Sequence, residues 1–240
     1  DLGHQIAADT RFPECMVENA FELLLRRDRV VDDMTAITAH REAFITGDLT
    51  VRSLFRSIVT SPDYQAGIAD EPGFVSKKMV TPGLLASSVQ DLTGFRFTAE
   101  GFDLLTTEMN GVLTLAGGAD GYYVTQSATD PNVTLLLVQE RLAEAAASYA
   151  VEFDQENPID ARLFTEIDWD ETTATNPDAV VAQIQALHHR LFGDVVAADG
   201  EEVEANLALF NDLYEVEGDV PATWVGLLSA LLRDPEFLLY

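Results

Sequence analysis

The chain has 240 residues, 47% of them hydrophobic and 9% aromatic, so it can bury a core without disulfides or structural metals. Its 41 acidic and 14 basic residues give a formal net charge of −27, which excludes direct binding to nucleic acid or to anionic lipid. A single cysteine excludes an internal disulfide and any multi-cysteine zinc or iron–sulfur site within the chain.

The charge is unevenly distributed along the sequence. Residues 1–80 hold 9 basic and 13 acidic residues, a net charge of −4, whereas residues 81–240 hold 5 and 28, a net charge of −23. Only Lys77 and Lys78 are lysines. Many carboxylates with few lysines are typical of salt-adapted proteins, and the alternative is an acidic surface that docks a basic or metal-bearing partner.

The first quarter of the sequence predicts three amphipathic helices. In the first, residues 10–29, apolar side chains at a spacing of three and four place Cys15 on the buried stripe, as an inert thiol. The second, residues 32–46, is ended by Gly47. The third begins near Thr50 and stops at a Ser-Pro pair. We therefore expect an N-terminal helical segment over residues 1–65.

Residues 66–80 contain Gly, Pro and both lysines and are predicted to be a connector. The second helical segment, residues 81–240, begins with Thr81 as a helix N-cap. Its irregular region, residues 94–134, is rich in glycine and predicts loops with one short strand pair, 111–115 with 122–125. Helices are predicted at 83–93, 134–154, 178–192, 201–214 and 221–232, with a short one near 161–166.

The fold class that follows is mainly α: a helical bundle in which two related helical segments flank the irregular Gly-rich region, with one short β-hairpin. The two helical segments are predicted to be related because they share a sequence pattern: residues 50–64 align with residues 223–237 at a constant offset of 173. Each copy has a helix that is stopped by a Pro and followed by an acid and an aromatic residue. One compact domain over residues 1–240 is the alternative to separate segments.

Two acidic loops are candidate cation sites. In the first, Gly117-Gly118-Ala119-Asp120-Gly121 offers carbonyl oxygens and the Asp120 carboxylate, with Asp130 as a second ligand, and such oxygens are the ligands that Ca²⁺ prefers. The second contains Asp168 and Asp170. A plain glycine turn and a solvated acidic loop are the alternatives, since neither matches the EF-hand pattern.

The remaining chemistry-bearing residues predict no catalytic site. His188 and His189 point about 100° apart on a helix, so we expect one packed and one exposed side chain rather than a chelating pair. His4 and His40 have no partner in the sequence. Cys15 is not part of a Cys-x-x-Cys-His motif, so no covalent haem is expected. No nucleophile elbow is present, and no feature of the sequence identifies two of the 41 acidic residues as a pair of catalytic carboxylates.

Several patches resemble a known family. Arg11-Phe12-Pro13-Glu14-Cys15, Leu24-Leu25-Arg26-Arg27, the stretch 54–64, the stretch 84–94 and the end of the chain, residues 222–238, are similar to helical terminal modules of secreted bacterial proteins. Those proteins form planctomycete-type, cytochrome c-associated families of unknown function. The resemblance implies an exported, mostly helical module with a c-type cytochrome as a partner, and no catalytic residue to carry over.

The sequence therefore predicts a non-catalytic scaffold or docking module of an exported bacterial protein that binds a protein partner. We expect no membrane insertion, because no apolar run reaches the roughly 18 residues of a membrane span. The chain opens on Asp1 and ends on Tyr240, and we interpret it as a processed piece of a longer protein. The alternatives are a cation-assisted enzyme acting on extracellular polymer and a self-assembling shell or filament subunit.

Overall fold

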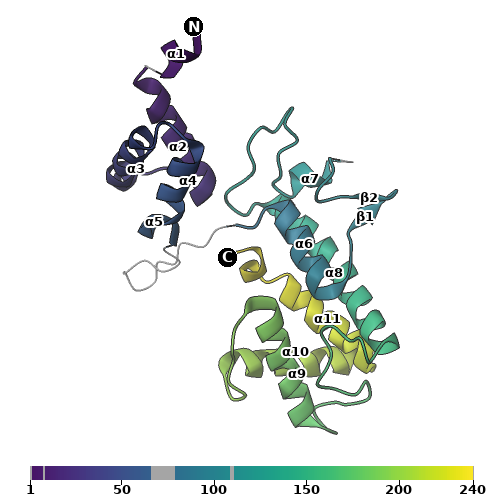
Figure 1. Ribbon diagram of the computed structural model, residues 1–240. Coiled ribbons are helices and arrows are strands. Elements are labelled where there is room, and N and C mark those ends of the chain that lie inside the picture. Colours follow the sequence, from purple (N-terminus) through teal and green to yellow (C-terminus); the bar gives the residue numbers. More distant parts are fainter. Residues whose placement is uncertain (1, 8, 66–78, 109–110, 240) are drawn as a thin grey trace. The chain divides into compact units, whose positions relative to one another are not determined.

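The structure, a computed structural model, describes residues 2–7, 9–65, 79–108 and 111–239. The chain forms two compact units, Asp1–Met79 and Val80–Tyr240, which are described separately (Figure 1). The boundary falls inside the predicted connector 66–80, of which residues 66–78 lie outside the described residues. Helices dominate both units and the described residues form one two-stranded sheet, which confirms the predicted mainly α class.

Unit 1 is a small helical unit built around α2, α3 and α4. Its elements in chain order are α1 (Leu2–Ala7), α2 (Arg11–Leu25), the 3₁₀ turn η1 (Val31–Asp33), α3 (Met34–Thr46), α4 (Val51–Val59) and α5 (Pro62–Gln65). The three longer helices pack on one another and bury one cluster, comprising Val17, Ala20, Phe21, Leu25, Ile37, Phe44, Leu54 and Ile58.

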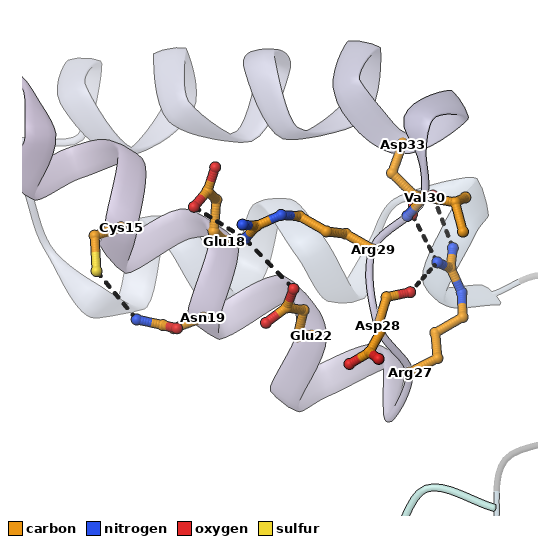
Figure 2. Close-up of polar contacts among 9 residues, drawn as sticks. All are labelled: Cys15, Glu18, Asn19, Glu22, Arg27, Asp28, Arg29, Val30 and Asp33. Atoms are coloured by element: carbon orange, nitrogen blue, oxygen red, sulfur yellow. Dashed lines mark hydrogen bonds and ion pairs between the residues drawn. The ribbon is translucent and has the colours of Figure 1, made fainter.

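The predicted burial of Cys15 is wrong, because the thiol is exposed. The buried stripe of α2 contains Val17, Ala20 and Phe21. Cys15 is two residues from Val17, about 200° around the helix, and so lies on the opposite face. Its Sγ accepts a hydrogen bond of 3.2 Å from the Asn19 side chain (Figure 2).

The α2–α3 junction is held by ion pairs (Figure 2). Helix α2 ends at Leu25, earlier than the predicted residue 29, because Arg26 adopts a left-handed conformation with φ of 56°. The Arg27 guanidinium then donates to both carboxylate oxygens of Asp33, at 2.6 and 2.8 Å, and this contact lowers the pKa of Asp33. Arg29 pairs with Glu18 at 2.9 Å and with Glu22 at 3.4 Å.

Unit 2 is a larger bundle in which α11 packs between α8 and α10 (Figure 1). Helix α9 packs against α10, and α6 packs against α8. In chain order its elements are α6 (Pro82–Thr93), β1 (Thr98–Ala99), β2 (Phe102–Asp103), α7 (Val112–Leu115), α8 (Val133–Glu156), α9 (Pro177–Phe192), α10 (Glu201–Glu217), α11 (Val220–Leu232) and η2 (Pro235–Leu238). Trp224 of α11 is fully buried and its ring lies 4.8 Å from that of Phe210 on α10.

The short hairpin exists but at another place than predicted. β1 pairs antiparallel with β2, whereas residues 112–115 of the predicted first strand form the helical turn α7. The two strands are joined by Glu100 and Gly101, with φ of 53° and 85°. Two successive residues with positive φ make the tight turn whose twist suits a two-residue hairpin loop.

Two buried polar side chains hold the long segment between α8 and α9. Asp154 of α8 is buried and its carboxylate accepts the backbone N–H groups of Arg162, Leu163 and Phe164 at 2.8–2.9 Å. Gln183 of α9 donates to the Leu163 carbonyl and accepts from two further backbone N–H groups. Because these bonds fix the segment in an irregular conformation, the short helix predicted near 161–166 does not form.

Candidate docking site

The Gly-rich loop between α7 and α8 folds back on α7 before it projects outward. The backbone N–H of Gly118 donates to the Leu113 carbonyl at 2.8 Å, and a Cβ at Gly118 would lie 2.4 Å from the Leu113 side chain. Only glycine therefore fits against α7 at this position. Ala128 donates to the Gly117 carbonyl at 2.8 Å, which closes the base of the loop.

Asp120 organises the tip of this loop. One of its carboxylate oxygens, Oδ1, accepts the backbone N–H groups of Tyr122, Tyr123 and Val124, each at 2.8 Å. The carbonyl of Val124 in turn accepts the N–H of Asp120 at 3.0 Å. These backbone hydrogen bonds, first that from Tyr122, lower the pKa of Asp120, so the carboxylate is charged at neutral pH. A carboxylate that gathers successive N–H groups fixes a turn without a helix or sheet.

The fixed tip presents two tyrosines to solvent. The side chains of Tyr122 and Tyr123 are 79% and 86% exposed. Their rings pack edge to face, with centroids 4.6 Å apart and an interplanar angle of 86°. Large aromatic side chains are normally at least half covered, so a pre-ordered exposed pair is the most distinctive surface feature of unit 2.

Unit 2 as a whole is strongly negative. Unit 2 carries 28 acidic and 5 basic residues, and the stretch between Arg190 and Arg233 has nine acids and no basic residue. A hollow of about 500 Å³ between α9, α10 and the start of η2 is lined by Asp194, Glu202 and Asp234, among other residues. A cationic surface would therefore be attracted to unit 2 as a whole.

The structure does not bring the other predicted cation ligands together with Asp120. Asp130 is exposed and accepts a hydrogen bond from Thr129, while Asp168 and Asp170 are exposed in the segment that follows α8. Glu171 accepts from the Asp168 N–H, which is the main cause of its lowered pKa. Among residues 2–7, 9–65, 79–108 and 111–239, no group of three or more His, Cys, Asp or Glu side chains could hold a metal ion. Ca²⁺ binding at these loops stays a prediction.

The histidine pair behaves as predicted. His188 is buried and its Nε2 contacts the Asn206 side chain at 2.9 Å, whereas His189 is exposed. In unit 1, His40 is buried and contacts Ser57. The side chain of His4 lies outside the described residues.

Sequence reasoning found Asp120 and missed the role of its neighbours. Tyr122 and Tyr123 were expected in a strand, where alternate side chains would face a core. The signal that could have found them is an Asp followed by Gly within two residues of a Gly-Gly pair, a composition typical of side-chain-stabilised turns. Comparison of the chain with protein-family models, with curated proteins and with solved structures found no match.

No helix in the described part of the chain is both long enough and apolar enough to cross a bilayer.

Proposed function

We propose that this protein is a non-catalytic docking module that binds a basic protein surface through the Tyr122–Tyr123 loop of unit 2. The observation that carries the proposal is the Asp120-organised loop tip, which holds two tyrosines outward without a covering element. Because the loop is already ordered, little conformational entropy is lost when it binds. Tyrosine is among the residues that dominate binding energy at protein interfaces.

Charge supports a basic partner. The net charge of −23 on unit 2 raises the association rate of a cationic protein and repels acidic ones. At contact, an arginine or lysine on the partner can lie over a tyrosine ring, an arrangement favoured by the charge distribution of the aromatic face. Steering by charge and anchoring by the aromatic pair together give a salt-sensitive, specific interaction.

The partner we favour is a c-type cytochrome with a basic surface, and the setting is the bacterial envelope. Both come from the likeness to secreted cytochrome-associated modules, carried by segments such as Arg11-Phe12-Pro13-Glu14-Cys15. The Asp120 carboxylate, which the enzyme alternative would use, accepts three backbone N–H groups of its own loop.

The test is calorimetric titration of the full chain with two purified probes, a basic c-type cytochrome and a haem-free basic protein of similar size. We expect binding at 20 mM NaCl that weakens at 150 mM NaCl, because salt screens charges more than about 8 Å apart. Replacing both tyrosines, Tyr122→Ser and Tyr123→Ser, should weaken binding by about tenfold or more. Tyr214→Ser, on α10, is the matched control and should leave affinity unchanged.

Two variants of Asp120 separate loop order from charge. Asp120→Asn keeps an acceptor oxygen for the three N–H groups, whereas Asp120→Ala removes it. Binding should fall further in the alanine variant. If the tyrosine variants bind like the parent chain, or if neither probe binds at 20 mM NaCl, the docking proposal is wrong. Preference for the haem protein over the haem-free protein supports the cytochrome assignment, and equal affinity overturns it.

A further inference from the structure

A second surface of the molecule has the opposite charge and belongs to unit 1. A groove of about 460 Å³ runs between the end of α3 and the start of α4. Its lining combines two arginines, four hydroxyl side chains and no carboxylate: Ala43, Thr46, Gly47, Thr50, Arg52, Ser53, Arg56 and Ser57. In a chain with a net charge of −27, a groove whose charged side chains are all cationic requires an explanation.

The two arginines of the groove differ from Arg11, Arg27 and Arg29 of the same unit in having no ion pair with any described residue. Arg27 and Arg29 are paired with carboxylates (Figure 2), and Arg11 is paired with Asp9. Arg52 and Arg56 form no ion pair with any described residue, although both are exposed. They are four residues apart on α4, so both guanidinium groups reach the same side of the helix.

Ser57 also differs from three nearby hydroxyl residues, Thr46, Ser53 and Thr60. Thr46, Ser53 and Thr60 each donate their hydroxyl proton to a backbone carbonyl one turn earlier. The Ser57 Oγ has a single contact among the described residues, with His40 Nδ1 at 2.8 Å. His40 is only 4% exposed, and its Nε2 has no hydrogen-bond partner in the described structure.

The orphan Nε2 determines how the Ser57 hydroxyl is used. Burial lowers the pKa of His40, partly opposed by the charge of Asp63, so the ring is neutral at pH 7. One nitrogen of a neutral ring carries the proton. A buried N–H without an acceptor is rarer than a buried acceptor without a donor, so the proton belongs on Nδ1 and is donated to Ser57. The Ser57 hydroxyl proton is then free to be donated to a ligand in the groove.

We propose that this groove binds a small organic oxyanion, a carboxylate or phosphate group, between Arg52 and Arg56 with the Ser57 hydroxyl as a further donor. Guanidinium groups match the geometry of both anions, and a charged hydrogen bond is stronger than a neutral one. The volume falls in the range of pockets for small organic ligands and exceeds what a bare inorganic ion needs. The inference concerns unit 1 and is independent of the docking function.

The experiment is calorimetric titration of the full chain with citrate and with pyrophosphate, at a constant ionic strength of 0.15 M set with NaCl. We expect saturable binding of at least one probe, and the better of the two identifies the carboxylate or the phosphate class. Arg52→Gln and Arg56→Gln should each weaken binding by about tenfold, and the double variant should abolish it. Arg11→Gln removes the same charge from unit 1 at an ion-paired site and should leave affinity within about twofold.

The hydroxyl is tested by Ser57→Ala, with Thr60→Ala as its control, because the Thr60 hydroxyl is already bonded to the Arg56 carbonyl. We expect weaker binding in the first variant and no change in the second. If neither probe binds, or if Arg11→Gln weakens binding as much as the groove variants do, the site does not exist. Equal affinity in Ser57→Ala and the parent would remove Ser57 from the site. If Ser57→Ala fails to fold, the surface variants Arg52→Gln and Arg56→Gln still test whether the groove binds the anion.

Discussion

The helix pairs α3–α4 of unit 1 and α10–α11 of unit 2 share a sequence pattern but not a pattern of burial. Leu54 of α4 and Leu227 of α11, 173 residues apart, are both fully buried. At the next residue the pairs diverge, because Phe55 is 37% exposed whereas its counterpart Leu228 is fully buried.

The difference follows from what packs against each helix. Helix α4 contacts α2 and α3, which lie along one stripe, whereas α11 lies between α8 and α10. The same spacing of apolar residues therefore occurs in α4, which is buried on one face, and in α11, which is buried on two faces. A repeated pattern fixes where a helix ends, and the neighbouring elements decide how much of it is buried.

The units also differ in how they hold their connections. Unit 1 uses short turns closed by ion pairs and helix caps, such as Arg27 with Asp33. Unit 2 fastens a long segment to its core with Asp154 and Gln183. Both tryptophans of the chain, Trp169 and Trp224, lie in unit 2, so tryptophan fluorescence follows unit 2 while circular dichroism follows both units. The comparison can therefore be tested unit by unit.

The largest effect is expected for Asp154→Ala. The change leaves two buried and one part-buried backbone N–H groups without an acceptor, and we expect the free energy of unfolding of unit 2 to fall by about 4 kcal/mol. Urea unfolding followed by tryptophan fluorescence measures this loss. Glu152→Ala, an exposed position on the same helix, should change it by less than about 0.5 kcal/mol. An equally small effect of Asp154→Ala would mean that the segment 157–176 is not fastened in this way.

Leu54→Ala should have the next largest effect, on unit 1. Leu54 is fully buried in the cluster of α2, α3 and α4, and its truncation should cost about 3 kcal/mol. The circular dichroism transition of unit 1 should move to lower temperature while the tryptophan transition stays. If both transitions move together, the two units unfold as one, and their stabilities cannot be assigned to separate sets of contacts.

A smaller, pH-dependent effect is expected from His40. Its folded pKa is lowered by burial, so its contribution to the stability of unit 1 is present above the ordinary value of 6.5 and is lost as the pH falls below it. Thermal unfolding followed by circular dichroism at pH 7.5 and pH 5.5 should show a larger drop in midpoint for the parent than for His40→Gln. His189→Gln, at an exposed position, should keep the parental drop; equal drops in parent and His40→Gln would contradict the prediction.

The smallest expected effect is an increase in the stability of unit 1. Asp48 connects α3 to α4 with φ of 56°, a conformation that a residue with a Cβ adopts at some cost. Asp48→Gly removes that cost but raises the conformational entropy of the unfolded chain. We therefore expect the free energy of unfolding of unit 1 to rise by up to about 1 kcal/mol. Ala39→Gly, within the exposed face of α3, should instead lose about 1 kcal/mol. Chemical unfolding followed by circular dichroism distinguishes the signs, and a loss for Asp48→Gly would mean that the turn is unstrained.

Local signals allowed much of the fold to be predicted from the sequence. Thr81 caps the helix that it was expected to cap, α4 begins directly after Thr50 as predicted, and Gly94 ends α6 with φ of 81°. Such signals depend on the residues within one turn. The role of Asp154 could not be predicted, because its partners lie 8–10 residues further along and depend on how the segment packs.

The candidate site was predicted in part. The sequence singled out Asp120 because carboxylates and glycines suit a cation loop, and the structure shows this side chain bonded to its own backbone. Cys15 was misplaced because an apolar stripe can be drawn through α2 in two adjacent registers, and only the packing of α3 and α4 selects one. Periodicity gives the existence of a face more reliably than its orientation.

The backbone N–H of Val80 donates a hydrogen bond of 2.8 Å to the Leu238 carbonyl, so the beginning and the end of unit 2 lie next to each other. Ends that meet can be linked by a few residues, and the chain can then be reopened elsewhere. The turn around Ile159, which is 96% exposed, is a suitable opening. Unit 2 should therefore tolerate circular permutation, and the same closeness would let it be inserted into a loop of a host protein without stretching the host.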